Sequence, residues 1–284
     1  MGDGTGLQSP PCRMVTDDEV EHLHEHGWVQ LKQFVDPGAL SGILDVAREQ
    51  MGEDGDSNPL HPFVEAAVAE GGAGVKYFNA HSAGGLRNPV LRPVIEEVGK
   101  NAQRLLQRRR PDGTSLDIRF YQDLLAPKLP SSKVSRHGGN GPTSFHQDFI
   151  TFAVDRTGGM TFWMPLESYG LESGTMSFVS GSHRLGVMGD YTTYGDGDAL
   201  TAFPELQDLE MSAPMHYELG DITVHTHLTV HGASENLTDR PRWAWLLIVQ
   251  PEDTCWNGAP CPNFDHRKMQ PWQPMQGERF PVIS

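Results

Sequence analysis

The sequence predicts an α+β protein in which helices come first and an antiparallel β-sandwich or barrel follows. Apolar residues recur with helical spacing only before Leu116. After that point, short β-rich runs alternate with clusters of Gly, Pro, Asn and Asp, a pattern typical of sandwiches and barrels. The 31 glycines and 21 prolines also favour turns and loops over a helical bundle.

Local signals place the individual elements. Thr16, with Glu19 three residues later, is a helix-capping pair, and Gly27 ends that helix. A short alternating strand follows, and a proline then opens a second helix. The expected elements are a helix starting at Thr16, a strand at 28–31, helices opening at Asp36 and covering 90–109, and strands at 116–125, 149–154, 160–166, 175–179, 222–231 and 242–249.

The chain is expected to form one domain. Its parts are a flexible lead (1–15) and the domain itself (16–284), with a core at about 116–250 and a Pro-rich tail that wraps the surface (251–284). Long connections inside compact domains often line binding sites, so the loops 131–144 and 186–215 are expected to wall a pocket.

The acidic composition narrows the partners. A formal net charge of −15 repels nucleic acid and anionic membranes, so we expect neither as a partner and a small molecule as substrate. Three cysteines without framework spacing argue against a disulfide scaffold and for a reducing compartment. No apolar run is long enough to span a membrane and no secretory signal is recognisable, so we expect a cytoplasmic protein. The oligomeric state is open.

A His-x-Asp pair is the first feature that carries chemistry. If His146 and Asp148 lie on a strand, their side chains point to the same face and can bind one metal ion. The pair alone is weak evidence, because this spacing is common by chance.

Three downstream histidines could complete a metal site. His225, His227 and His231 share one face of the expected strand, and any of them could supply a second imidazole beside the His-x-Asp pair. Two imidazoles and one carboxylate are the ligand set of non-haem Fe(II) oxygenases. Arg242 follows His231 by eleven residues, where a guanidinium could hold the distal carboxylate of 2-oxoglutarate in bidentate fashion.

Four blocks of residues resemble the phytanoyl-CoA dioxygenase superfamily, and the resemblance covers roughly residues 14–250. The blocks are Phe145-His146-Gln147-Asp148; Phe162-Trp163-Met164-Pro165-Leu166; Glu172-Ser173-Gly174-Thr175-Met176 with Ser180-Gly181-Ser182-His183-Arg184; and the segment from His231 to Arg242. The resemblance implies a double-stranded β-helix (jelly-roll) core buttressed by the N-terminal helices. It also selects His231 as the second imidazole, because this residue has the family's spacing to Arg242.

The resemblance assigns roles to single residues. These are His146, Asp148 and His231 as iron ligands, Arg242 for 2-oxoglutarate, Gln122 and Lys128 near the co-substrate or substrate, and Trp163 in the co-substrate pocket. One position departs from the pattern, because Ala233 stands where several members have Ser. A hydrogen bond to 2-oxoglutarate is therefore expected to be missing, or to come from Ser234 or Thr238.

The resemblance implies a dioxygenase that uses Fe(II), 2-oxoglutarate and O2 and releases succinate and CO2. Hydroxylation of a small organic molecule is expected. The blocks are most similar to actinobacterial natural-product tailoring members, so the expected substrate is a secondary metabolite or a carboxylic acid. The carboxylate of Asp148 disfavours halogenation, since related halogenases lack it. Desaturation, epimerisation and ring closure use the same metal site and stay open.

Two other classes of protein also stay open. A zinc-dependent or other metal-dependent enzyme on a cupin-like barrel would need no co-substrate, and therefore no Arg242. A catalytically silent member would only bind a ligand. The intact set of His146, Asp148, His231 and Arg242 argues against such decay.

Overall fold

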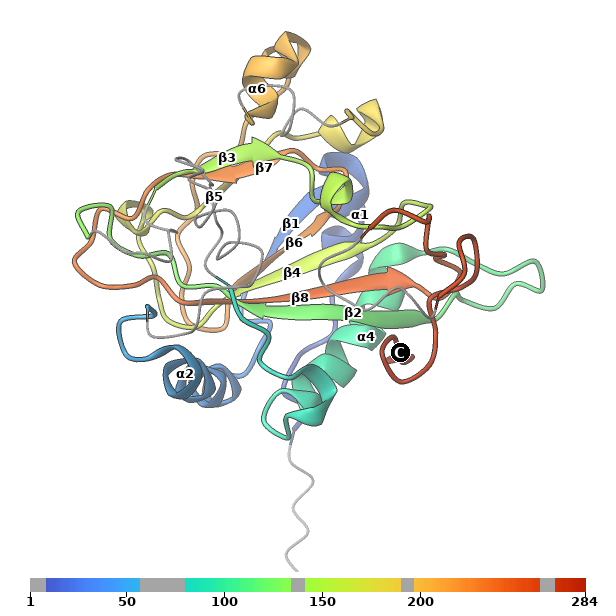
Figure 1. Cartoon of the computed structure of the whole chain (residues 1–284), viewed down its shortest axis with the longest axis horizontal. Coiled ribbons are helices and arrows are strands. Elements are labelled where there is room, and N and C mark those ends of the chain that lie inside the picture. Colours follow the sequence, from blue (N-terminus) through green and yellow to red (C-terminus); the bar gives the residue numbers. More distant parts are fainter. Residues whose placement is uncertain (1–8, 57–79, 134–140, 190–196, 261–268) are drawn as a thin grey trace, which may run out of the picture.

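Two antiparallel sheets face each other in the computed structural model, which describes residues 9–56, 80–133, 141–189, 197–260 and 269–284. The large sheet has the strand order β1–β6–β4–β8–β2, and the small sheet has the order β3–β7–β5 (Figure 1). The strands are β1 (Trp28–Leu31), β2 (Ile118–Leu125), β3 (Thr143–His146), β4 (Met160–Pro165), β5 (Met176–Phe178), β6 (Ile222–Thr226), β7 (His231–Ala233) and β8 (Ala244–Pro251). This arrangement confirms the α+β class and the double-stranded β-helix core.

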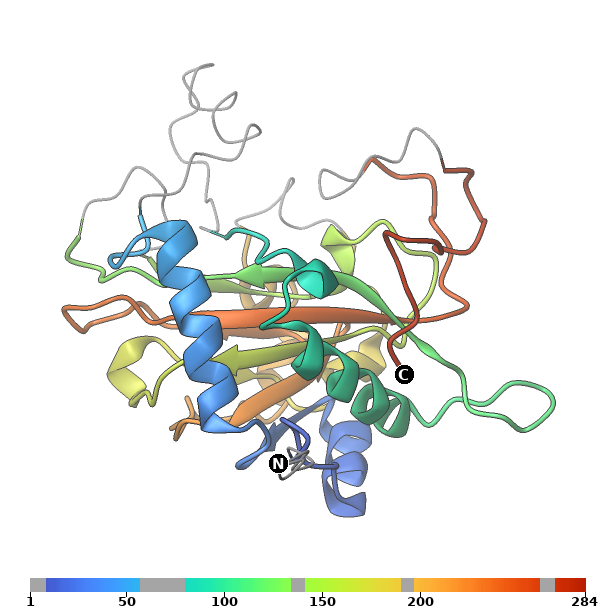
Figure 2. The same ribbon diagram turned by 90° about the horizontal axis from the view of Figure 1, so that it is seen from below.

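Helices cover the outer face of the large sheet. The helices α2 (Pro37–Met51) and α4 (Arg92–Leu106) lie across it, as Figure 2 shows from below. Their apolar sides pack against outward side chains of the strands, such as Phe162 and Leu247, and form the main core. The other helices are α1 (Asp17–His26), α6 (Ala199–Ala202) and the 3-10 helices η1 (Gly85–Arg87), η2 (Asp148–Thr151), η3 (Leu171–Ser173), η4 (Ser182–Leu185) and η5 (Pro204–Asp208).

The helix α1 begins and ends as the sequence predicts. The Thr16 hydroxyl accepts a hydrogen bond from the Glu19 backbone N–H, and the Glu19 carboxylate accepts one from the Thr16 N–H. Gly27 has a φ of 84°, and a Cβ there would collide with the ring of His183. The Gly27 carbonyl accepts a hydrogen bond from the Thr226 N–H, which ties the end of α1 to β6.

Two strand predictions are wrong. Residues 149–154 hold the 3-10 helix η2 and an irregular segment, and the strand in this region is β3, just before it. The predicted strand 222–231 ends at Thr226, where a turn closed by the Thr229 N–H and the Thr226 carbonyl leads into β7 of the other sheet. Because this turn contains no Gly or Pro, alternation alone does not reveal the break.

The tail after β8 is more than the surface wrap that the sequence suggests. Trp256, Met275 and Phe280 are buried in a second apolar cluster with Tyr121 of β2. The backbone N–H of Ile283 donates to the Ile118 carbonyl at 2.9 Å, and the Phe120 N–H donates to the Pro281 carbonyl at 3.0 Å. The tail therefore covers the free edge of β2, which would otherwise present unpaired backbone groups.

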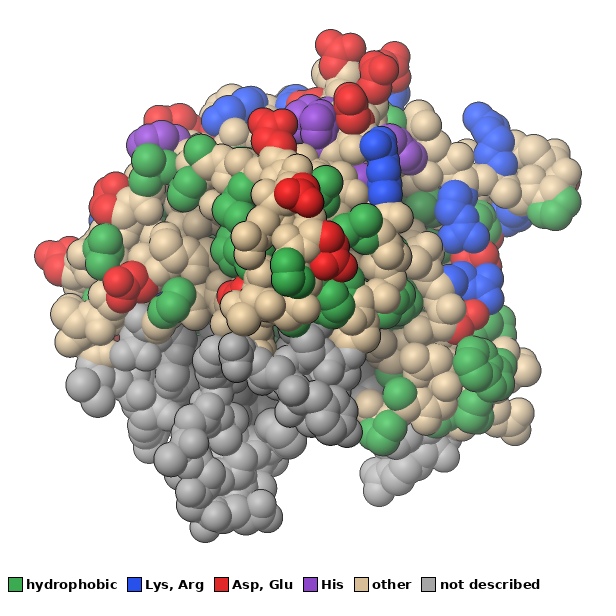
Figure 3. Space-filling model, turned by 90° about the horizontal axis from the view of Figure 1, so that it is seen from above, with side chains coloured by type: hydrophobic (Ala, Val, Ile, Leu, Met, Phe, Trp, Pro, Cys, Tyr) green, Lys and Arg blue, Asp and Glu red, His purple; other side chains and the backbone are tan. Residues whose placement is uncertain are grey.

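One face of the molecule carries its negative charge in a dispersed form. Asp and Glu side chains are scattered over the face shown in Figure 3 rather than gathered in one place. On that face the negative charge marks no single binding site. In the parts of the chain that the structure describes, no helix has the length and apolar character needed to cross a membrane.

Gly99 provides a test of how the tail packs on α4. A Cβ at Gly99 would collide with the backbone carbonyl of Ile283. Alanine in a helix interior is normally about 1 kcal/mol more favourable than glycine, but overpacking against a backbone that cannot rotate away costs about 3 kcal/mol. We expect Gly99→Ala to lower the free energy of unfolding in urea. Gly42→Ala in α2, where the nearest atom is Val90 Cγ1 at 3.3 Å, should leave it unchanged or raise it.

Deleting Ile283 and Ser284 is the decisive control for this prediction. Without the tail carbonyl, Gly99→Ala should raise the free energy of unfolding relative to the truncated parent chain. A loss of stability in both backgrounds would show that the collision is not the cause.

Candidate metal centre

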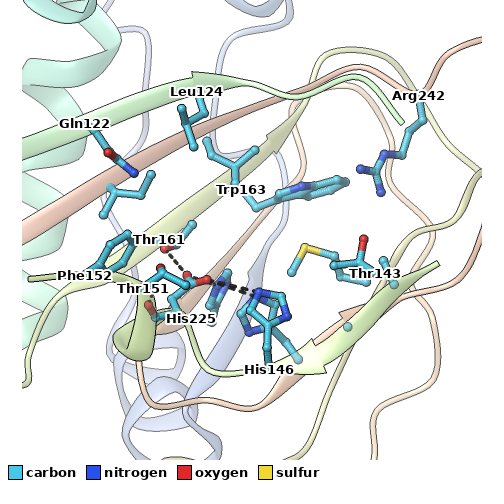
Figure 4. Close-up of a pocket in the computed structure, with 17 residues that line it drawn as sticks. Gln122, Leu124, Thr143, His146, Thr151, Phe152, Thr161, Trp163, His225 and Arg242 are labelled. Atoms are coloured by element: carbon cyan, nitrogen blue, oxygen red, sulfur yellow. Dashed lines mark hydrogen bonds and ion pairs between the residues drawn. The ribbon is translucent and has the colours of Figure 1, made fainter. Parts of the chain in front are cut away.

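A cavity of about 310 Å³ lies between the two sheets. Its walls come from both sheets and present a mainly apolar surface, and several polar side chains converge on one point (Figure 4). His146, Asp148 and His231 lie in this wall, and their ligand atoms are all within 4.8 Å of one another. The structure therefore brings together the three residues that the sequence predicts as iron ligands.

Strand pairing in the small sheet positions the two imidazoles. His146 is the last residue of β3 and His231 is the first of β7, and the two are direct partners across the antiparallel pair. Asp148 is the first residue of η2, so the chain turns between His146 and Asp148 rather than continuing as the expected strand. The Nε2 atoms of both histidines lie 3.6 Å from Asp148 Oδ1.

Backbone carbonyls fix the tautomer of both histidines. Nδ1 of His146 lies 2.8 Å from the Ser144 carbonyl, and Nδ1 of His231 lies 2.9 Å from the Thr229 carbonyl. A carbonyl oxygen only accepts hydrogen bonds, so each Nδ1 is the donor and carries the proton. The Nε2 lone pairs then face Asp148 Oδ1 and are free to bind a cation.

The two oxygens of Asp148 have different surroundings. Oδ1 faces the two imidazoles, whereas Oδ2 accepts hydrogen bonds from Thr161 Oγ1 at 2.7 Å and from His225 Nε2 at 3.2 Å. Thr161 on β4 and His225 on β6 are cross-strand partners, so they reach the same oxygen. Asp148 is thus held through Oδ2, and Oδ1 is available to bind a metal. This arrangement fits a divalent ion bound by two nitrogens and one oxygen.

His225 and His227 lie outside this ligand set. The strand pattern alone could not separate them from His231, which the family resemblance selected through its spacing to Arg242. The turn after β6 sends His231 alone to the small sheet. His225 forms a hydrogen bond with the Asp148 carboxylate through Nε2, and its Nδ1 is buried without a partner among the described residues. His227 is buried, and its ring packs edge-on against Phe152 with centroids 4.7 Å apart.

The charges of the centre suit cation binding. Burial alone would raise the pKa of Asp148, but the imidazoles of His231, His146 and His225 hold it well below its ordinary value. Burial lowers the pKa of His231 well below its ordinary value, and His225 and His146 add to this effect. The carboxylate is therefore charged and this imidazole neutral, the forms that bind a metal. Burial opposes protonation of His146, but Asp148 raises its pKa, so protons compete with a cation at this ligand.

A buried guanidinium lies at one end of the cavity. Arg242, just before β8, donates a hydrogen bond from Nη1 to the Gly174 carbonyl, and its guanidinium carbon is 4.9 Å from the centre of the Trp163 ring. Among the described residues, no carboxylate lies within ion-pair distance of Arg242, and its buried Nε has no partner. Burial lowers the pKa of Arg242 to about 10. A buried charge without a counter-charge is costly, which favours an anionic ligand here.

Lys128 lies behind the cavity wall rather than in it. Its Nζ donates to the Thr143 hydroxyl and the Gly141 carbonyl, each at 3.1 Å, and to the Ser234 carbonyl at 2.8 Å. Burial, with a smaller contribution from Arg242, lowers the pKa of Lys128 to about 7. Lys128 therefore reaches the cavity only through Thr143, which lines it.

Some of the other residues predicted from the sequence line the cavity and some do not. Gln122 and Trp163 line the cavity. Thr238 does not, because its hydroxyl bonds to Asn236 Oδ1 at 2.7 Å within the turn before Arg242. None of the described residues of the loop 186–215 lines the cavity either, and residues 190–196 of this loop lie outside the described part of the chain. Thr143, within the loop 131–144 that was expected to wall a pocket, does line the cavity. No sequence pattern marked the supporting roles of Thr161 and Thr143.

Thr161→Val tests the support of Asp148. The substitution keeps the shape of the side chain and removes the hydroxyl that holds Oδ2, so we expect Co(II) affinity to fall about tenfold, at the lower end of typical losses for such partners. Titration calorimetry of Co(II) into metal-free protein measures this. Thr175→Val is the matched control, because the Thr175 hydroxyl is buried without a partner among the described residues. Unchanged affinity in Thr161→Val, or an equal loss in Thr175→Val, would contradict the assignment.

Several solved structures share the fold of this chain. The 2-oxoglutarate-dependent carbocyclase SnoK from nogalamycin biosynthesis is 21% identical, with a TM-score of 0.68 over 95% of this chain and 97% of that chain. The epimerase SnoN from the same biosynthesis is 20% identical, with a TM-score of 0.71 over 94% and 98%. EctD from S. alaskensis, solved with bound Fe, is 14% identical, with a TM-score of 0.58 over 86% and 82%.

Comparison of the sequence itself identifies the family. No curated protein matches this chain. The family model described as phytanoyl-CoA dioxygenase (PhyH), however, matches residues 23–244, which is most of the chain. The protein therefore belongs to the phytanoyl-CoA dioxygenase (PhyH) family and is an enzyme of the 2-oxoglutarate-dependent non-haem iron oxygenase class.

Proposed function

We propose that this enzyme uses Fe(II), 2-oxoglutarate and O2 to hydroxylate a small organic molecule, with His146, Asp148 and His231 as the iron ligands. The observation that carries the proposal is the pairing of two features in one cavity. Two imidazole nitrogens and one carboxylate oxygen converge on a point, and at one end lies a buried guanidinium that has no counter-charge among the described residues. Iron bound by this set would supply the activation of O2 and the oxidising power.

The ligands leave room for a co-substrate. His146, Asp148 and His231 belong to the small sheet and the turn that follows β3, so they approach an ion from one side. Thr161 and His225 hold the outer oxygen of Asp148 and oppose its rotation toward the ion as a second ligand. An ion held by these three residues would keep positions open toward the cavity.

Arg242 is the proposed partner of the distal carboxylate of 2-oxoglutarate. A guanidinium matches a carboxylate with two parallel hydrogen bonds, and the guanidinium of Arg242 packs against the Trp163 ring. A relative supports this assignment of the co-substrate, since SnoN was solved with Fe3+, alpha-ketoglutarate and nogalamycin RO. EvdO2 of Micromonospora carbonacea was likewise solved with 2-oxoglutarate.

Thr143 is the proposed replacement for the family serine that is absent at Ala233. Thr143 and Ala233 are partners across β3 and β7, and both line the cavity with Arg242. The Lys128 amine donates to the Thr143 oxygen, so the Thr143 hydroxyl proton is left to donate into the cavity. Ser234 and Thr238, the candidates from the sequence, do not line the cavity.

Hydroxylation of a natural product is the proposed reaction. The named relatives support the substrate class, because SnoK and SnoN both come from nogalamycin biosynthesis. Their titles name a carbocyclase and an epimerase, so ring closure and epimerisation are the alternative outcomes at the same metal. A metal enzyme without co-substrate is disfavoured, because it gives Arg242 no anion to bind.

A titration of the weak visible charge-transfer band of Fe(II) with bound 2-oxoglutarate tests the proposal. Under anaerobic conditions the band should appear on addition of 2-oxoglutarate and be lost in His231→Ala. Arg242→Gln should weaken 2-oxoglutarate binding about 10- to 100-fold, the equivalent of one or two charge-assisted hydrogen bonds, and leave Fe(II) affinity unchanged. Arg240→Gln, at an exposed neighbouring guanidinium, is the matched control and should change neither. A folded, iron-loaded protein without the band would refute the co-substrate assignment.

A further inference from the structure

Gln122 enters the cavity because β2 is irregular. In a regular strand, residues two apart share a face. Phe120 nevertheless packs in the main core on the helix side, whereas Gln122 lines the cavity. The pairing with β8 explains the change, since Phe120 is opposite Val249 and Gln122 is opposite Ile248. Two residues of β2 thus advance against one of β8, which is a β-bulge.

After the bulge, the side chains of β2 alternate between the two faces of the sheet in the shifted order. Leu124 lines the cavity with Gln122, while Asp123 and Leu125 face the helix side. Asp123 is held there by hydrogen bonds from the Ala83 N–H and the Trp245 indole N–H. Without the bulge, Gln122 would face the helical layer. Bulges commonly re-aim side chains next to active sites.

The side-chain amide of Gln122 has no hydrogen-bond partner in the part of the chain that the structure describes. The residue is 7% exposed. Figure 4 shows Gln122 and Arg242 at opposite ends of the cavity. Gln122 is therefore out of reach of the distal carboxylate that Arg242 is proposed to bind, and its amide is left for another ligand.

The surroundings of Gln122 define what that ligand can be. Leu124, Phe152 and Ile248 are apolar, and the Thr151 hydroxyl donates to the Asp148 carbonyl at 2.8 Å. Among the described residues that line this end, none beyond the metal ligands is charged. A carboxylate, phosphate or ammonium placed here would be buried without a counter-charge. A primary amide, in contrast, can both donate to a carbonyl or hydroxyl and accept from a hydroxyl or amide.

We propose that this end of the cavity binds a neutral, mainly apolar substrate, and that Gln122 orients it through one carbonyl, hydroxyl or amide group. The inference rests on the proposed function for the identity of this molecule as the one that is oxidised. It narrows the substrate class by disfavouring free carboxylic acids and thioesters of the highly anionic coenzyme A. Gln122 thus acts on the substrate rather than on 2-oxoglutarate.

Probes of one shape and different charge test this inference. The probes are 2-naphthamide, 2-naphthoate, 2-naphthylmethylammonium and 2-methylnaphthalene, added anaerobically to protein with Fe(II) and 2-oxoglutarate. Their binding is measured from naphthalene fluorescence, in parallel with the visible charge-transfer band. We expect the amide to bind at least tenfold more tightly than either ion. Gln122→Leu should weaken the amide about tenfold, as expected for one lost hydrogen bond, and leave 2-methylnaphthalene within about twofold.

The isosteric variant Gln122→Glu separates polarity from shape. It should weaken the amide and tighten the ammonium probe, because it places a charge at the same position. Tighter binding of naphthoate than of the amide, an amide affinity unchanged in Gln122→Leu, or no binding of any probe would each overturn the inference. If the visible band is absent but the amide preference depends on Gln122, the proposed function fails and the assignment of this end of the cavity stands.

Discussion

The carboxylate of Asp148 joins the two sheets at the centre of the molecule. Its outer oxygen is held from the large sheet by Thr161 and His225, and its inner oxygen faces His146 and His231 of the small sheet. Each pair of supporting residues consists of direct cross-strand partners. The geometry of the proposed metal site is therefore a consequence of strand register, and a slip of one residue in either sheet would abolish it.

The cavity is divided by this centre into two ends of different chemistry. At one end Arg242, Trp163 and Thr143 offer a charge and hydrogen-bond donors that suit a dicarboxylate. At the other end the amide of Gln122 lies in mainly apolar surroundings. Such a division would let a charged co-substrate and a neutral substrate bind beside one iron without competing for the same part of the cavity. Lys128 strengthens the first end indirectly, since it orients Thr143 and joins it to the chain after β7.

Sequence patterns predicted the parts of the fold that local chemistry determines. The Thr16–Glu19 capping pair and the helices after it are found where the sequence places them. The family resemblance, through the spacing of His231 to Arg242, selected the three residues whose ligand atoms the fold brings within 4.8 Å of one another. These features can be recognised in the sequence because a helix cap depends only on neighbouring residues, and because the motifs of the family have a characteristic spacing.

The remaining features of the site depend on tertiary contacts and could not be predicted from the sequence. The turn after β6 contains no Gly or Pro, so the sequence could not show that His225 and His231 belong to different sheets. The role of Thr161 depends on a cross-strand neighbour that is far away in the chain. The bulge that aims Gln122 into the cavity leaves no mark in the alternation of β2, because nearly all residues of that strand are buried on both faces.

Crystals grown with Mn(II), a redox-stable substitute for Fe(II), would show which residues bind the metal. The anomalous signal of the ion locates it without reference to the protein atoms. We expect one site bound by the protein atoms His146 Nε2, His231 Nε2 and Asp148 Oδ1 alone, with Asp148 Oδ2 still held by Thr161 and His225. An ion bound through His225, or through both oxygens of Asp148, would contradict this expectation.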